Sequence, residues 1–125
     1  MEVLIVDDSE SVRIALRHRL EERGYIIYEA FDGFNALEVL QDTEQIKMIV
    51  TDLNMPGLNG LDFVEQARGF IKYKETPVLV YTTEVCDFLK ERARDLGVLA
   101  WLVKPIPLDK MVKVVEKIFS KEKNA

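Results

Sequence analysis

The chain has 125 residues, of which 48% are hydrophobic and 31% charged, a composition typical of a globular protein that is long enough to bury one core. Its formal net charge of −5 argues against nucleic acid as a partner, because binding a phosphate backbone requires a basic face. No apolar run approaches the length of a membrane span and none is preceded by a basic leader, so we expect no membrane association.

Five short apolar runs rich in Val, Ile and Tyr are the predicted strands. They do not alternate cleanly with polar residues, which is typical of strands covered on both faces. In chain order they occupy residues 3–6, 25–28, 48–51, 78–81 and 99–103.

The segments that follow these runs carry apolar residues at three- and four-residue spacing, which predicts amphipathic helices. The five stripes are Val12, Ala15, Leu16 and Leu20; Ala36, Leu37 and Leu40; Leu61, Val64, Ala67 and Ile71; Leu89, Ala93 and Leu96; and Leu108, Met111, Val112, Val115, Ile118 and Phe119. Gly24 and Gly97 follow the first and fourth stripes at the position where glycine commonly ends a helix.

Strand and helix therefore alternate along the whole chain, which predicts the α/β class. A five-stranded parallel sheet with five helices on both faces is expected, because short right-handed crossovers join such units. No linker or repeat interrupts the pattern, so residues 1–125 are interpreted as a single domain without an output domain.

In such a sheet the binding crevice lies beyond the carboxyl ends of the strands. The second strand ends in Glu29 and Ala30 and is expected to contribute nothing to that crevice. The other four strands bring the following residues to one edge of the sheet: Asp7, Asp8, Asp52, Thr82, Thr83 and Lys104.

Three carboxylates in one crevice repel one another unless a cation is present. Because the ligands are hard oxygens with no His or Cys nearby, Mg²⁺ is the expected metal. The lysine supplies a second positive charge for a phosphoryl group, and a carboxylate can itself be the nucleophile. The residues therefore predict phosphoryl transfer onto an aspartate.

Four motifs resemble those of receiver domains of two-component response regulators. They are Val6-Asp7-Asp8-Ser9; Thr51-Asp52-Leu53-Asn54-Met55-Pro56-Gly57 with Gly60; Thr82-Thr83-Glu84; and Trp101-Leu102-Val103-Lys104-Pro105. The likeness covers essentially the whole chain and is strongest to the stand-alone chemotaxis (CheY) type. It implies a flavodoxin-like sheet with strand order 2-1-3-4-5.

By this resemblance Asp52 is the phosphoacceptor. Asp8, Asp52 and the backbone carbonyl of Asn54 would bind Mg²⁺ directly, and Asp7 would act through water. Lys104 would hold a phosphoryl oxygen, as would the Thr82 hydroxyl and the Thr83 backbone.

The resemblance also implies a switch. Thr82 would move toward the phosphoryl group, Trp101 would rotate with it, and the face of the fourth helix, fifth strand and fifth helix would change its partner affinity. Asn54 and Glu84 would tune dephosphorylation. A cis peptide is expected between Lys104 and Pro105.

The partners implied are a sensor histidine kinase and a flagellar motor switch protein or a phosphatase, with the chain acting as a monomeric signalling switch and not as an enzyme. Ile106, Val98 and Ala100 depart from the residues common at their positions in this type. These departures leave the identity of the partner open.

Other interpretations stay open. Asp7 and Asp8 could cap a helix together with Ser9, and Lys104 taken alone could be a surface lysine. The chain could be a phosphorelay intermediate that passes its phosphoryl group to a histidine phosphotransferase. It could instead be an aspartyl-phosphate phosphatase, although those enzymes usually carry an aspartate where this chain has Asn54.

Cys86 is the only cysteine, so no internal disulfide can form, and a cytoplasmic location is expected. It is expected to be a small, partly buried apolar residue near the start of the fourth helix. His18 is expected to be a solvated helix residue.

Overall fold

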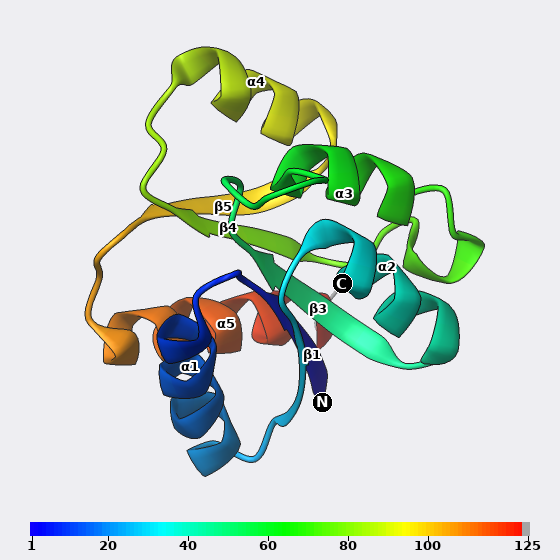
Figure 1. Ribbon diagram of the computed structural model, residues 1–125. Helices are drawn as coiled ribbons and strands as arrows, with labels where there is room; N and C mark the ends of the chain where they lie inside the picture. Colours follow the sequence, from blue (N-terminus) through cyan, green and yellow to red (C-terminus); the bar gives the residue numbers. More distant parts are fainter. Residues whose placement is uncertain (124–125) are drawn as a thin grey trace.

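The computed structural model describes residues 1–123, in which strands alternate with helices and one 3₁₀ turn lies between the third helix and the fourth strand (Figure 1). The elements are β1 (Glu2–Val6), α1 (Glu10–Glu22), β2 (Ile26–Ala30), α2 (Gly33–Asp42), β3 (Ile46–Thr51), α3 (Gly60–Ala67), η1 (Ile71–Tyr73), β4 (Val78–Thr82), α4 (Asp87–Asp95), β5 (Val98–Val103) and α5 (Leu108–Lys123).

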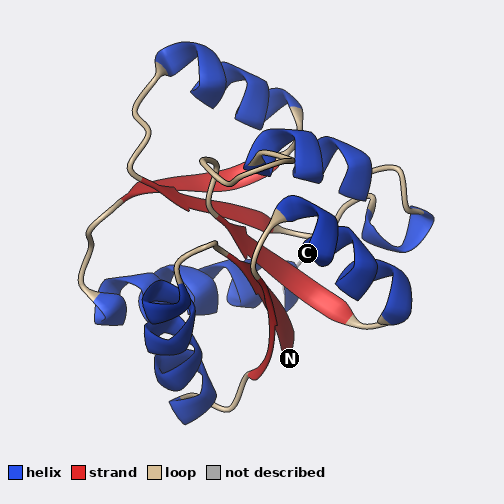
Figure 2. Cartoon of the chain, in the orientation of Figure 1, coloured by secondary structure: helices blue, strands red, loops and turns tan. Residues whose placement is uncertain are grey.

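The five strands form one parallel sheet in the order β2-β1-β3-β4-β5, which confirms the predicted fold class and strand order. Figure 2 shows the sheet as the middle layer, with helices above and below it. β1 and β3 are neighbours, and Val6 pairs with Thr51, so the residues that follow these two strands emerge side by side.

Two cores lie on opposite faces of the sheet. Val3 and Ile5 of β1 point toward α1 and α5, where they pack with Leu16 and Met111. Leu4 and Val6 of the same strand join the other core, under α2 and α3. Figure 1 shows α1 and α5 together on one side of the sheet and α2, α3 and α4 on the other. Burial on both faces explains why β1, β3 and β4 are mostly apolar. The expectation that all five strands are covered on both faces is wrong for β2 and β5, because they are the edge strands and leave residues such as Ile26 and Leu99 exposed.

Side chains at the helix starts provide the caps that keep the loops short. The Ser9 hydroxyl accepts the amide proton of Val12, and the Asp32 carboxylate accepts that of Asn35. At the other end of α1 and α4, Gly24 and Gly97 adopt φ angles of 90° and 82°, in the left-handed region that glycine enters at little cost.

The prediction that Ile71 extends the third helical stripe is wrong. The chain leaves α3 after Ala67 and turns at Gly69, and Ile71 lies in η1 with 94% of its surface exposed. Tyr73, which is 1% exposed, takes the buried position two residues later. The Arg68 guanidinium stabilises this turn by donating to the carbonyls of Tyr73 and Thr76.

Smaller differences occur elsewhere. β2 begins at Ile26 and not at Tyr25, and β3 begins two residues earlier than predicted, at Ile46. Cys86 precedes α4 as its N-cap and is exposed, so the expectation of partial burial is wrong. His18 is exposed as expected. Within the described residues, no helix combines the length and apolarity needed to cross a bilayer.

Candidate functional site

Three aspartates gather at the carboxyl ends of β1 and β3, as the sequence predicts. Oxygens of Asp7, Asp8 and Asp52 all lie within 4.8 Å of one another. Asp7 and Asp52 are 2% and 8% exposed, whereas Asp8 faces solvent. The strand pairing holds the cluster together, because the Asp52 amide donates to the Val6 carbonyl at 2.9 Å.

Lys104 completes the cluster from β5. Its Nζ donates to Asp7 Oδ2 at 2.7 Å and to Asp52 Oδ2 at 3.0 Å, and it lies 5.3 Å from the centroid of the Tyr81 ring. Its amide donates to the Thr82 carbonyl at 2.8 Å, which fixes where the side chain leaves β5. The structure therefore excludes the alternative that Lys104 is an unengaged surface lysine.

Burial and charge set the protonation of this group. Desolvation by burial raises the pKa of Asp7, although the hydrogen bonds from Lys104 and Ser9 oppose that shift. Burial alone would lower the pKa of Lys104. The hydrogen bonds to Asp7 and Asp52 outweigh burial, so the pKa of Lys104 is raised and the ammonium stays charged at neutral pH.

Both oxygens of Asp52 are held in place. Oδ1 accepts the amide proton of Leu53 at 2.6 Å, and Oδ2 accepts from Lys104. The backbone behind the carboxylate is packed against Gly60 at the start of α3, where a Cβ atom would lie 2.0 Å from the Asp52 carbonyl oxygen. Only glycine allows α3 to approach β3 this closely.

The cluster fits a magnesium ion by the chemistry of its donors. It offers three carboxylates that are close enough to share one cation, and a single lysine compensates only part of their charge. Mg²⁺ prefers such hard oxygens and keeps several of its waters, which the exposed side of Asp8 leaves room for. Asp7, Asp8 and Asp52 are the residues that would hold it.

The two predicted switch residues are connected through Glu84. The Thr82 hydroxyl accepts the amide proton of Glu84 at 3.2 Å, and Trp101 Nε1 donates to the Glu84 carbonyl at 3.0 Å. Thr82 is fully buried and Trp101 is partly buried. Thr82 and Trp101 lie on different strands, yet both are hydrogen-bonded to the backbone of Glu84.

The remaining predicted residues surround the cluster more loosely. Asn54 and Thr83 are exposed, as residues at the mouth of a crevice would be. The Glu84 carboxylate accepts the amide proton of Cys86 within its own loop. The Lys104–Pro105 peptide is cis, as expected.

The prediction that the second strand contributes nothing is wrong. Glu29 of β2 accepts a hydrogen bond from Arg13 Nε at 3.1 Å, and Arg13 Nη1 donates to the Asp7 carbonyl at 2.7 Å. The available signal in the sequence was Glu29, a charged residue at the end of an apolar run, together with Arg13 and Arg17 in the helix that precedes this strand. These two arginines are one helical turn apart and both pair with Glu29.

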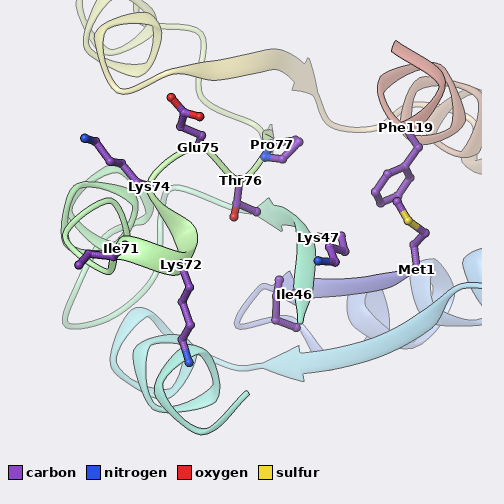
Figure 3. A pocket seen from close by; sticks show the side chains of 10 residues that line it. All are labelled: Met1, Ile46, Lys47, Ile71, Lys72, Lys74, Glu75, Thr76, Pro77 and Phe119. Carbon is purple, nitrogen blue, oxygen red and sulfur yellow. The ribbon is translucent and has the colours of Figure 1, made fainter. Parts of the chain in front are cut away.

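A cavity of about 400 Å³ lies at the opposite end of the sheet, near the amino ends of β3 and β4 (Figure 3). It is lined in part by Ile46, Lys47, Thr76 and Pro77. The Ile71 side chain points away from most of the lining in this view. None of the predicted site residues lines this cavity.

Comparison with known proteins agrees with this geometry. Residues 3–116 match the family described as the response regulator receiver domain. The chain is 38% identical over 106 residues to chemotaxis protein CheY1 of Helicobacter pylori, covering 84% of this chain and 86% of that protein.

Solved structures are similar as well. Chemotaxis response regulator CheY4 of Vibrio cholerae superposes with a TM-score of 0.87 at 37% identity, covering 94% of this chain and 97% of that one. Response regulator protein TrrA of Thermotoga maritima, in complex with Mg²⁺-BeF, gives a TM-score of 0.80 at 26% identity, covering 93% of this chain and 96% of that one. The chain thus belongs to the response regulator receiver domain family and is of the CheY type.

Proposed function

We propose that this protein is a phosphorylation-controlled signalling switch that accepts a phosphoryl group on Asp52 in the presence of Mg²⁺. A sensor histidine kinase is the donor. The juxtaposition of Asp52 with Asp7, Asp8 and the Lys104 ammonium is the observation that supports this assignment, because it combines a nucleophile, a metal-binding set and a fixed cation at one point.

In the proposed phosphoryl transfer, Asp52 and Lys104 have different roles. A carboxylate oxygen of Asp52 attacks the phosphorus of phosphohistidine; the O–P bond forms as the P–N bond breaks, and the imidazole nitrogen leaves with the electron pair. Asp7, Asp8 and Asp52 would hold a Mg²⁺ ion, and its charge would neutralise part of the negative charge on the incoming phosphoryl group. Lys104, whose ammonium is already aimed at Asp52 Oδ2, would pair with another phosphoryl oxygen.

The phosphoryl group would then bias the face formed by α4, β5 and α5. Thr82 lies next to the site and is connected through Glu84 to Trp101, so movement of the Thr82 hydroxyl removes the acceptor of the Glu84 amide. A partner that binds one arrangement of this face more tightly reads the phosphorylation state. The likeness to chemotaxis proteins supports a flagellar motor switch protein or a phosphatase as that partner. The proposal includes a monomeric, cytoplasmic protein with no further enzymatic activity.

Intact-mass analysis tests the acceptor directly. The protein is incubated with Mg²⁺ and a small phosphodonor, and we expect one phosphoryl group per chain in the wild type. Asp52→Asn should acquire none, whereas Asp42→Asn, which alters an exposed aspartate at the end of α2, should behave as the wild type. An unmodified wild-type protein would contradict the assignment. Continued hydrolysis of a phosphomonoester over many turnovers would instead indicate a phosphatase.

A further inference from the structure

Arg13 of α1 makes a contact with the site that the phosphoacceptor chemistry does not itself require. Its Nε donates to Glu29 Oε1 at 3.1 Å, and its Nη1 donates to the backbone carbonyl of Asp7 at 2.7 Å. The Arg13 and Glu29 side chains are only 14% and 23% exposed. The planar guanidinium therefore bridges β2 and the loop that carries the acidic pair, with both partners fixed.

With this contact from Arg13, every polar group of Asp7 has a hydrogen-bond partner. The Asp7 amide donates to the Ala30 carbonyl at 3.1 Å, Oδ1 accepts the Ser9 amide proton at 2.9 Å, and Oδ2 accepts from Lys104. The Asp7 carbonyl is the one remaining polar group, and Arg13 binds it. The carbonyl belongs to the peptide that joins Asp7 to Asp8, so its orientation sets the direction in which the Asp8 side chain leaves the backbone.

Asp8 depends on that peptide more than its neighbours do. Asp7 and Asp52 are buried, and their carboxylates are hydrogen-bonded within the site. Asp8 is exposed, and no hydrogen bond to its carboxylate occurs among the described residues. Its position near the other two carboxylates is therefore determined by the backbone.

We propose that Arg13 is a positioning residue for magnesium binding: held by Glu29, it fixes the Asp7–Asp8 peptide so that the Asp8 carboxylate faces the metal site. We base this on the proposed function, because Mg²⁺ is the ion that the carboxylates would hold. Groups that orient metal ligands from outside the ligand set commonly change metal affinity by about tenfold or more.

Electrostatics alone predicts the opposite result. A positive charge close to the carboxylates repels Mg²⁺, so removal of the arginine charge would strengthen metal binding if charge were its only influence. If Arg13 instead positions the metal ligands, the same substitution should weaken Mg²⁺ binding. The sign of the change therefore separates the two explanations.

Arg17 provides a matched control on the same helix. Its Nη1 donates to Glu29 Oε2 at 2.7 Å, and its Nε lies 3.3 Å from Glu21 Oε2. It shares the Glu29 partner and the charge of Arg13, but within residues 1–123 it makes no hydrogen bond to the Asp7–Asp8 peptide. Arg17→Gln removes a charge and an ion pair with Glu29 while leaving the contact to Asp7 intact.

Calorimetric titration of the full chain with MgCl₂ tests the proposal. We expect Arg13→Gln to raise the Mg²⁺ dissociation constant about tenfold. Arg17→Gln should have the same Mg²⁺ dissociation constant as the wild type or a slightly lower one. Binding by Arg13→Gln that equals or exceeds that of the wild type would overturn the positioning role, as would an equal loss in both variants. A wild type that bound no Mg²⁺ would contradict both this proposal and the proposed function, whereas a wild type that binds Mg²⁺ no more tightly than Arg13→Gln would contradict this proposal alone.

Three further measurements separate positioning from general damage to the fold. Urea unfolding of each variant identifies any loss of folded protein. Arg13→Lys keeps the positive charge but lacks the several N–H donors of a guanidinium, so it should fold and still bind Mg²⁺ more weakly than the wild type. In phosphorylation by a small phosphodonor, Arg13→Gln should need more Mg²⁺ for half-maximal rate but reach the wild-type rate at saturation. A reduced rate at saturating Mg²⁺ with unchanged Mg²⁺ dependence would contradict the proposal.

Discussion

The Lys104 ammonium lies 3.0 Å from the Asp52 carboxylate, although the two residues are 52 positions apart in the chain. The same nitrogen contacts Asp7, so one cation is shared between two buried carboxylates. Before a metal binds, Lys104 is the only side-chain cation in the described chain that pairs with either of these two aspartates. Under the proposed function, Lys104 would therefore compete with Mg²⁺ for the oxygens of Asp7 and Asp52.

Replacement of Lys104 should therefore have opposite effects on metal binding and on transfer. Lys104→Met removes the competing charge, so Mg²⁺ should bind more tightly in a calorimetric titration. Phosphorylation of Asp52 should be slower by about tenfold or more, because a positive charge aimed at the phosphoryl group is lost. Lys113→Met, which alters an exposed lysine of α5, is the control and should change neither quantity.

The two neighbouring aspartates should not be equivalent. Asp8→Ala removes the exposed carboxylate, which has no competing partner, and should weaken Mg²⁺ binding more than Asp7→Ala. Asp7→Ala also releases Lys104 from one of its two ion pairs, and that release partly offsets the lost carboxylate. Equal losses in a side-by-side titration, or a larger loss for Asp7→Ala, would show that the pair has the reverse roles.

The link from Thr82 to Trp101 predicts a fluorescence signal. Trp101 is the only tryptophan, so its emission reports on that site alone. Phosphodonor and Mg²⁺ should change the emission of the wild type and of Thr82→Ser, which keeps the hydroxyl. Thr82→Val keeps the shape but lacks the hydroxyl and should lose most of the change, while intact-mass analysis still finds phosphorylated Asp52. A full response in Thr82→Val would exclude the hydroxyl from the switch.

Gly60 should be intolerant of any side chain. A Cβ atom there would lie 2.0 Å from the Asp52 carbonyl oxygen and 2.9 Å from the Leu53 Cα, and both are backbone atoms that cannot move without displacing β3 or α3. We expect Gly60→Ala to lower the free energy of unfolding in urea by about 3 kcal/mol. At Gly69 the nearest atom to an added Cβ is 3.1 Å away, so Gly69→Ala should cost much less.

The pair of arginines on Glu29 predicts a pH dependence of stability. Burial would raise the pKa of Glu29, but the hydrogen bonds from Arg17 and Arg13 outweigh it, so this pKa is lowered from its ordinary value of 4.5. The folded state therefore favours the ionised form, and the associated stability is present above pH 4.5 and is lost as the pH falls through the folded value. Glu29→Gln should lower the free energy of unfolding by about 1 kcal/mol at neutral pH.

Urea unfolding at a series of pH values checks this. The difference between the wild type and Glu29→Gln should shrink as the solution is acidified below pH 4.5. A difference that stays constant down to the lowest pH at which the protein folds would show that the carboxylate charge is not its source.

The strand ends were predictable because parallel strands impose a simple rule. Asp7, Asp8, Asp52 and Lys104 each follow an apolar run, and all strands of a parallel sheet end at the same edge. Their place at one edge therefore follows from the alternation of strand and helix, whereas the neighbouring positions of β1 and β3 follow from the strand order that the family resemblance implies. The structure adds which carboxylates Lys104 pairs with and how deeply each is buried.

Ile71 was mispredicted because helical spacing carries no information on where a helix stops. Its position is compatible with the stripe of Leu61, Val64 and Ala67, and the chain departs from that register only because it turns at Gly69. The contacts that stabilise the turn come from Arg68, which also donates to the Leu96 carbonyl, far along the chain. Sequence periodicity is local, whereas this contact is not.

Arg13 and Glu29 were missed for a related reason. A helix and a strand meet at a geometry that depends on how both pack on the sheet, so the pairing of their side chains is not encoded in the spacing of either. Glu29 pairs in register with Ile5 of β1 and lies beside the strand that carries Asp7. The sequence shows two arginines four residues apart and a glutamate after an apolar run, but only the fold shows that one of the arginines reaches the Asp7 carbonyl.

Asp7 and Lys104 are 97 positions apart, and their contact has a consequence for synthesis of the chain. A growing polypeptide that has left the ribosome only as far as β4 already contains all three aspartates but has not yet gained the ammonium that balances them. Its acidic residues repel one another, and the crevice has no lysine to offer a phosphoryl donor. If Asp52 accepts a phosphoryl group as proposed, a chain that ends before Lys104 should therefore be phosphorylated more slowly than the full chain.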